Sequence, residues 1–423
     1  MTLHEFITLH QADDINRLAL QRNRYPFLTD TDFRFALRQI EGRQRTRSKL
    51  PSVSDLPDWH YPARLSLEQC SSEVTARYKA SLVEGRTLAD LTGGMGIDTL
   101  FLSARFRETC YVERQEELCT LAAHNFGMLQ RNISIHCTDA GMFLEQMQPV
   151  DVIYLDPARR SAAGGKVFRV EDCEPDIIGL LPLLRTLCSV LLVKLSPMLD
   201  IAAALRSLPD TAEVHVVAVK NEVKELLLLC RFTSSSFALS DNLSATLSNN
   251  LSDNTPTASR AGDYRVISGS LAGCSADTTV FHAVNLLTSQ PSFTFRPADE
   301  QQAECLYADN LEEYLLEPNA AILKAGAFRL AAMRYSLSKL APNTHLYTAS
   351  RVPDNFPGRV WRLRGPADKK SLCDARLNIL SRNHPLAADQ LRRRFALHDG
   401  DTDWLIATRI GTRPVLLLAE QLR

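Results

Sequence analysis

The chain has 423 residues, a net charge of −1, 45% hydrophobic and 23% charged residues, which is ordinary for a globular protein of roughly two to four domains. No segment is apolar over about 18 residues, so no membrane span is expected, and the N-terminus lacks the basic and apolar regions of a signal peptide. The ten cysteines include no C-x-x-C pair. That argues against a disulfide framework or a zinc site and fits a reducing cytoplasm.

Residues 1–64 are predicted to form an N-terminal helical domain, because apolar residues such as Phe33 recur there at helical spacing. Between Arg34 and Lys49, six basic residues stand against a single acid, Glu41. Such a stretch can meet the phosphates of a nucleic acid. The alternative is a solvated helix face, since basic runs alone are weak motifs.

A further helix is predicted over 65–83, and it leads into the stretch T-L-A-D-L-T-G-G-M-G-I-D at 87–98. This stretch is typical of a short strand, a glycine-rich turn and the start of a helix, which is the nucleotide-binding opening of a doubly wound α/β sheet. Glycine lets a backbone turn sharply and approach a ligand closely, and the turn contains Gly93, Gly94 and Gly96. We expect the preceding helix to lie against the cleft. A plain structural turn is the alternative for this motif taken alone.

Four predicted strands in succession end on a carboxylate, namely Asp90, Glu113, Asp139 and Asp156. Open α/β sheets bind ligands at the carboxyl ends of their strands, so we expect these side chains to face one crevice. Strands also end on Asp for ordinary turn reasons, but four in order favour a binding site. No G-x-x-x-x-G-K-[ST] loop occurs, so ATP is not the expected ligand.

The order D-L-x-x-G-x-G, then E, then D, then D-P-x-[RYFW] resembles the class I S-adenosylmethionine-dependent methyltransferases. The resemblance covers residues 65–232 and implies a doubly wound, Rossmann-like α/β sheet that ends in an antiparallel hairpin, here at 214–219 and 224–231. In that family the second acid takes the ribose hydroxyls and the third takes the adenine amino group. One departure is Thr92, where many members have glycine. The resemblance implies that S-adenosylmethionine binds at Asp90, Thr92, Gly93, Gly94, Gly96, Glu113, Asp139 and Asp156.

The motif after the fourth strand, D-P-A-R, bears on the nucleophile. Exocyclic-amine methyltransferases of nucleic acids carry [DNS]-P-P-[YFW], in which the first side chain holds the target amine and the aromatic stacks on the base. We expect Asp156, Pro157 and Arg159 to form the catalytic motif, with Asp156 holding the amine or accepting its proton and Arg159 stacking on a base or gripping a phosphate. Arg160 and Lys166 would contact phosphates. A solvated loop is the alternative for the three basic residues.

D-P-A-R is also similar to the D-P-P-R of uracil C5 methyltransferases, which need a nucleophilic cysteine after the fifth strand. This chain has K-L-S-P there, at 194–197, and Cys188 precedes the strand, where a core position is expected. A ring or exocyclic nitrogen is therefore the expected target. His136 and His215 lie inside strand patterns and are expected to be ordinary core or face residues.

The remaining chain divides into three predicted parts. Residues 233–279 are rich in Ser, Asn, Asp and Thr and are predicted to form a mobile polar insertion. Residues 280–350 are expected to be ordered, with two helical runs around Pro318. Residues 351–423 carry 14 Lys and Arg against eight Asp and Glu. The stretches F-P-G-R-V and S-R-N-H-P-L of this tail, and E-P-N-A-A-I-L-K-A-G-A-F at 317–328, resemble a bacterial group of methyltransferases. The resemblance implies a ferredoxin-like segment over 280–350 and a C-terminal THUMP-like domain over 351–423.

THUMP domains proper bind RNA in tRNA-modifying enzymes, so RNA is the partner that this resemblance implies. We therefore predict a cytoplasmic enzyme that methylates a base nitrogen in tRNA or rRNA and needs neither metal nor membrane. Two alternatives stay open. One is a methyltransferase that acts on a protein or small molecule, and the other is a non-catalytic RNA-binding protein that kept the fold.

Overall fold

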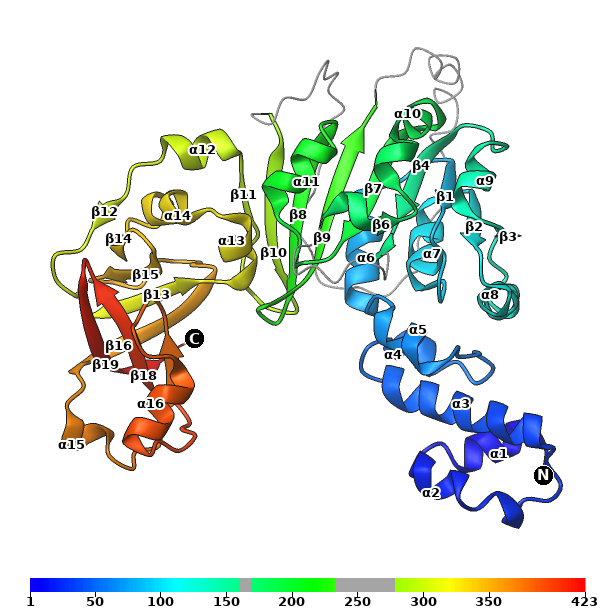
Figure 1. Cartoon of the computed structure of the whole chain (residues 1–423), viewed down its shortest axis with the longest axis horizontal. Helices are drawn as coiled ribbons and strands as arrows, with labels where there is room; N and C mark the ends of the chain where they lie inside the picture. Colours follow the sequence, from blue (N-terminus) through cyan, green and yellow to red (C-terminus); the bar gives the residue numbers. More distant parts are fainter. Residues whose placement is uncertain (160–168, 233–277, 423) are drawn as a thin grey trace, which may run out of the picture.

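The computed structural model describes residues 1–159, 169–232 and 278–422 (Figure 1). All but the last two residues of the predicted insertion at 233–279 lie outside this described part. Within it, no helix is both long and apolar enough to cross a membrane. The described residues form an N-terminal group of helices, a central nine-stranded sheet and a second, eight-stranded sheet.

The N-terminal region is helical as predicted, and it lies below the end of α6 in Figure 1, away from the central sheet. Phe6, Leu18, Phe33 and Ile40 are buried together in its own small core. The expected helix over 65–83 is in fact two helices, because Cys70 is extended and the Ser72 side chain starts a new helix by accepting from the Thr75 amide. The helices are α1 Leu3–Leu9, α2 Ile15–Ala19, η1 Arg22–Arg24, α3 Asp30–Thr46, α4 Pro51–Ser54, α5 Arg64–Gln69 and α6 Glu73–Leu82.

The central sheet has the strand order β11-β10-β8-β9-β7-β4-β1-β2-β3. Neighbours from β7 to β3 are parallel, whereas β9 runs antiparallel to β7 and β8 and so forms the expected hairpin. This mixed sheet confirms the predicted Rossmann-like methyltransferase class. Its strands are β1 Thr87–Asp90, β2 Glu108–Glu113, β3 Ile133–Cys137, β4 Val150–Leu155, β7 Cys188–Leu195, β8 Thr211–Val219, β9 Glu222–Arg231, β10 Val280–Leu286 and β11 Phe293–Phe295.

Both faces of the central sheet are buried, which explains why its middle strands are nearly all apolar. In β4, Val152 and Tyr154 pack into one core, whereas Ile153 and Leu155 pack into another on the opposite face. Short elements connect the strands: α7 Ile97–Leu102, η2 Ser103–Arg105, α8 Glu116–Met128, α9 Ala140–Leu144, the paired β5 Ala158–Arg159 and β6 Cys173–Glu174, η3 Val170–Asp172, α10 Ile177–Leu187 and α11 Ile201–Ser207.

The second sheet has the order β12-β14-β15-β13-β16-β19-β18-β17. The run before Pro318, predicted to be helical, is strand β13. It pairs with β15 and β16, and the consecutive residues Leu315 and Leu316 are both buried, in different cores. The elements are α12 Pro297–Gln302, β12 Leu306–Tyr307, β13 Tyr314–Pro318, α13 Ala320–Ala325, α14 Phe328–Arg334, β14 Ser338–Ala341, β15 Thr344–Ala349, β16 Gly358–Pro366, α15 Lys369–Leu372, β17 Asn378–Ser381, α16 Ala388–Phe395, β18 Asp403–Ile410 and β19 Arg413–Gln421.

Helix α13, which follows β13 of the second sheet, packs against the central sheet. Ala321 and Ile322 are fully buried among side chains of the central sheet, and α13 contacts β8, β9 and β10. The sequence places the start of the ferredoxin-like segment at residue 280, whereas β10 and β11 extend the central sheet. The chain therefore completes the central sheet before it turns into the second one.

Candidate active site

The main pocket lies at the carboxyl ends of β1, β2, β3 and β4. The glycine turn lines it, and so do Ser66 of α5 and Cys70 and Ser71 of the connection between α5 and α6. The region 65–83 therefore lies against this cleft, as expected from the sequence. Three of the four predicted strand-end acids line the pocket, namely Glu113, Asp139 and Asp156.

The glycines of the turn are required by geometry at two points. Gly94 and Gly96 have φ angles of +54° and +80°, which most side chains adopt only with strain. A Cβ at Gly93 would lie 2.2 Å from the ring of Tyr111. The Tyr111 hydroxyl donates to the Gly94 carbonyl oxygen at 2.6 Å, so this ring supports the turn from behind. The backbone of the turn is therefore left open toward the pocket.

Asp90 lies behind the turn rather than in the pocket. Its side chain is 1% exposed, and its two oxygens accept from the Thr92 amide at 3.0 Å and from the Thr99 hydroxyl at 2.6 Å. Burial raises the pKa of Asp90 to about 7. The sequence placed this carboxylate on the ligand, but the structure uses it to fix the turn to α7.

Thr92, which departs from the family pattern, joins the turn to the end of β4. Its hydroxyl oxygen accepts from the Asp156 amide at 2.7 Å. A glycine at this position has no hydroxyl with which to make that link. The departure thus fixes the distance between the glycine turn and the D-P-A-R motif.

Glu113 and Asp139 are held with their carboxylates at the pocket wall. Glu113 accepts from the amide of Gly94 at 3.0 Å and from that of Gln115 at 2.9 Å. Asp139 caps α9 by accepting from the Gly141 amide at 2.8 Å. Carboxylate oxygens have several acceptor positions, so both groups retain capacity to bind hydroxyl or amino groups of a ligand.

Asp156 forms an ion pair with Lys194, from the K-L-S-P stretch at the end of β7. Lys194 Nζ lies 2.5 Å from Asp156 Oδ2, and the Asp156 side chain remains 34% exposed. Burial raises the pKa of Asp156 above its usual range, and the Lys194 ammonium opposes that rise. Sequence reasoning used this stretch only for its missing cysteine and overlooked the lysine itself.

A buried charged cluster lies beneath the pocket. Lys79 is 0% exposed, and its Nζ lies 2.6 Å from Glu225, 3.2 Å from Asp98 and 3.0 Å from the Ser71 hydroxyl. Tyr154 donates to Asp98 at 2.8 Å. Burial alone would raise the pKa of Asp98, but the ammonium groups of Lys79 and Lys194 hold this pKa below its usual range. This aspartate is therefore ionised and joins the two lysines electrostatically.

The remaining residues singled out from the sequence lie in different parts of the chain. Pro157 lines the pocket, and Arg159 lies in β5, which pairs with β6. Arg160 and Lys166 lie outside the described residues. Cys188 is a core residue as predicted, fully buried, and burial raises the pKa of its thiol to about 12.

The basic stretch in α3 is largely bonded within the chain. Arg38 and Arg45 pair with glutamates. Arg43 and Lys49 donate to backbone carbonyls of following segments. Less positive charge is therefore available to a phosphate here than the sequence implies.

Comparison with known proteins decides the family. A crystal structure of a candidate methyltransferase from Porphyromonas gingivalis W83 is 32% identical, covers 100% of this chain and 98% of its own, and superposes with a TM-score of 0.81. The chain belongs to this methyltransferase family. Residues 314–357 match the family model of a ferredoxin-like domain, and residues 358–421 match that of a THUMP-like domain.

A more distant relative agrees with this assignment. An uncharacterized S-adenosylmethionine-dependent methyltransferase of Mycobacterium tuberculosis (strain H37Rv) is 23% identical over 382 residues, which are 87% of this chain and 90% of the relative. The predicted resemblance to class I methyltransferases with these two C-terminal domains is confirmed. The protein is thus an S-adenosylmethionine-dependent methyltransferase, and the pocket is its candidate active site.

The glycine turn makes a direct prediction for this methyltransferase. We expect Gly93→Ala to weaken S-adenosylmethionine binding at least about tenfold and to lower the free energy of unfolding by about 1–3 kcal/mol, because the new methyl group would displace the buried Tyr111 ring. Isothermal titration calorimetry and urea unfolding measure the two effects. Gly127→Ala is the matched control, since a Cβ there meets nothing within 4 Å. Unchanged cofactor affinity in Gly93→Ala would refute this role of the turn.

Proposed function

We propose that this methyltransferase transfers a methyl group from S-adenosylmethionine to a nitrogen of an RNA base. The observation that carries the proposal is the position of Asp156. Its partly exposed carboxylate lies in the pocket wall, and Thr92 and Lys194 fix it beside the glycine turn. A group that must hold an amine at a reacting carbon needs this kind of fixed position.

The residues of the pocket fit S-adenosylmethionine. The cofactor supplies an activated methyl group on a positively charged sulfonium. Gly93, Gly94 and Gly96 leave the turn without side chains that would fill the space, Glu113 offers acceptors for ribose hydroxyls, and Asp139 offers them for an amino group. The carboxylates around the pocket also favour a cationic ligand.

In this proposal Asp156 accepts a hydrogen bond from the target amine and so orients its lone pair toward the methyl carbon. The new N–C bond forms as the methyl–sulfur bond breaks, and the surplus proton on nitrogen passes to Asp156 or to water. Lys194 opposes the rise in the pKa of Asp156 that burial causes, and so favours the ionised carboxylate. Pro157 and Arg159 follow in the same motif and would border the base.

RNA is favoured as the substrate by the C-terminal region. Residues 358–421 match a THUMP-like domain, and THUMP domains proper bind RNA. Within it, α16 carries Arg392, Arg393 and Arg394, of which the last two are exposed. Basic side chains that face solvent are those that can meet phosphates. A protein or small-molecule substrate, or RNA binding without catalysis, are the outcomes that would replace this proposal.

The substrate is tested with radiolabelled S-adenosylmethionine, the purified chain and total RNA from a strain that lacks this gene. Label should enter one RNA nucleoside, which chromatography of digested RNA then identifies. RNA from the parent strain is the control and should accept little label, because its target is already methylated. If the chain binds the cofactor tightly but no label enters RNA, the substrate would be a protein or a small molecule instead of RNA.

The roles of the acids are separated by two variants. Asp156→Ala should abolish methyl transfer and leave cofactor affinity nearly unchanged, because this carboxylate is proposed to hold the substrate. Glu113→Ala should weaken cofactor binding by about 1.5–3 kcal/mol, the usual contribution of a hydrogen bond to a charged group. Calorimetry and single-turnover assays measure both. Methyl transfer that survives in Asp156→Ala, or cofactor affinity that survives in Glu113→Ala, would remove the corresponding role.

The ion pair predicts a change in pH dependence. Removal of the ammonium in Lys194→Met should raise the pKa of Asp156, because burial and the Asp98 carboxylate, which raise it, are then opposed by Lys79 without Lys194. The acid limb of kcat/KM should move to higher pH by at least about one unit, since activity requires the ionised carboxylate and is lost as pH falls through its pKa. Lys224→Met, which removes the partner of Glu222 at the start of β9, is the control. An acid limb that stays in place would show that Lys194 does not control Asp156.

A further inference from the structure

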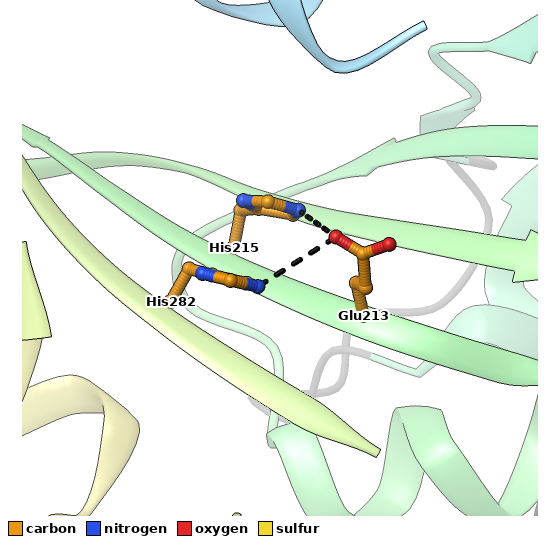
Figure 2. Close-up of side chains that lie close together, drawn as sticks. All are labelled: Glu213, His215 and His282. Atoms are coloured by element: carbon orange, nitrogen blue, oxygen red, sulfur yellow. Dashed lines mark ion pairs between the residues drawn. The ribbon is translucent and has the colours of Figure 1, made fainter. Parts of the chain in front are cut away.

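Two histidines and a glutamate meet on one face of the central sheet (Figure 2), and none of them lines the pocket. Glu213 and His215 are two positions apart on β8, so their side chains share a face. His282, on β10, stands directly opposite His215 in the parallel register. The backbone pairing of β8 with β10 thus brings the three side chains together.

The three groups point at a common centre. The imidazole rings are nearly parallel, with an interplanar angle of 10° and centroids 4.5 Å apart. Glu213 Oε2 lies 3.4 Å from His215 Nε2 and 3.6 Å from His282 Nε2. Both distances exceed the usual N–H···O length of about 2.7–3.2 Å. The buried Nε2 of His215 has no hydrogen-bond partner among the described residues.

These distances fit a tetrahedral metal. Nitrogen and oxygen ligands bind Zn²⁺ at about 2.0–2.1 Å, so two ligand atoms of a tetrahedral site lie about 3.3–3.4 Å apart. The gaps from Glu213 to the two histidines are therefore close to the edges of such a tetrahedron.

The surrounding contacts are those expected around metal ligands. The Tyr78 hydroxyl bonds His215 Nδ1 at 2.8 Å, and the Thr294 hydroxyl bonds His282 Nδ1 at 3.1 Å. Metal-bound imidazoles are usually oriented in this way through their other nitrogen. Arg231 donates to the second carboxylate oxygen of Glu213 at 3.0 Å. That leaves Oε2 for the centre, although the guanidinium charge itself opposes a nearby cation.

We propose that Glu213, His215 and His282 bind one Zn²⁺, with water as the fourth ligand. His282 and Glu213 are 21% and 27% exposed, so solvent can reach the open position. The ion would link β10 to β8 and thereby hold β10, which precedes the second sheet in the chain, in place. Two His and one carboxylate with a water is an established zinc set. This site was not expected from the sequence, which gives no C-x-x-C pair and separates the two histidines widely.

The test is made on the full chain, expressed without a polyhistidine tag and purified without chelators. Inductively coupled plasma mass spectrometry should find about one zinc per chain. Competition with a chromophoric chelator should show that His282→Ala and Glu213→Gln each bind zinc at least about 100-fold more weakly. Loss of a group that only hydrogen-bonds a metal ligand already lowers metal affinity about 10–100-fold. Zinc should also raise the melting temperature of the wild type and not that of the variants.

The matched control is His124→Ala. His124 stacks on His60 with centroids 3.6 Å apart, but its Nε2 bonds the Asp58 carbonyl oxygen, so zinc affinity should not change. Should His282→Ala fail to fold, Tyr78→Phe removes only the hydroxyl beside His215 and should weaken zinc about 10–100-fold. Iron in place of zinc, no metal in the wild type together with no binding of added ZnCl2, or equal affinity in all variants would overturn the proposal.

Discussion

The buried ammonium of Lys79 is the constraint on which the pocket depends. It joins α6, which follows the N-terminal helices, to Asp98 on α7 and to Glu225 on β9. A charged group that is removed from water in this way needs oppositely charged partners. Removal of one partner typically lowers the free energy of unfolding by about 3–5 kcal/mol. The cluster therefore fixes three segments that are distant in sequence into one arrangement. Because the glycine turn leads directly into α7, its position is set by this arrangement.

The same electrostatic cluster reaches the reactive side of the pocket. Tyr154, on β4, donates to Asp98, and β4 ends on Asp156, whose carboxylate pairs with Lys194. Burial alone would lower the pKa of Lys194, but the carboxylates of Asp156 and Asp98 raise this pKa above its usual range. The lysine therefore stays charged. Lys79 and Lys194 thus offset the charge of Asp98, and Lys194 also pairs with Asp156, which directly follows β4. A site of this kind is pre-organised for a charged ligand before any ligand arrives.

Local features of the site could be predicted from the sequence, whereas contacts across the sheet could not. The glycine turn and the acids at the strand ends are encoded within a few residues, and Glu113 lines the pocket as predicted. The direction of Asp90 depends on Thr99, which lies one helical turn beyond the glycines. The pairing of Lys194 with Asp156 and the meeting of His215 with His282 depend on strand order and register. Those emerge only once the sheet has formed.

The most direct measurement is a crystal structure of the chain with S-adenosylhomocysteine, the product of methyl transfer. The ligand should lie over the glycine turn, with ribose hydroxyls on Glu113, the adenine amino group near Asp139, and sulfur facing Asp156. Such a complex would place the reacting methyl beside the carboxylate that forms an ion pair with Lys194. Density in another part of the molecule, or a sulfur atom that faces away from Asp156, would contradict the proposed active site.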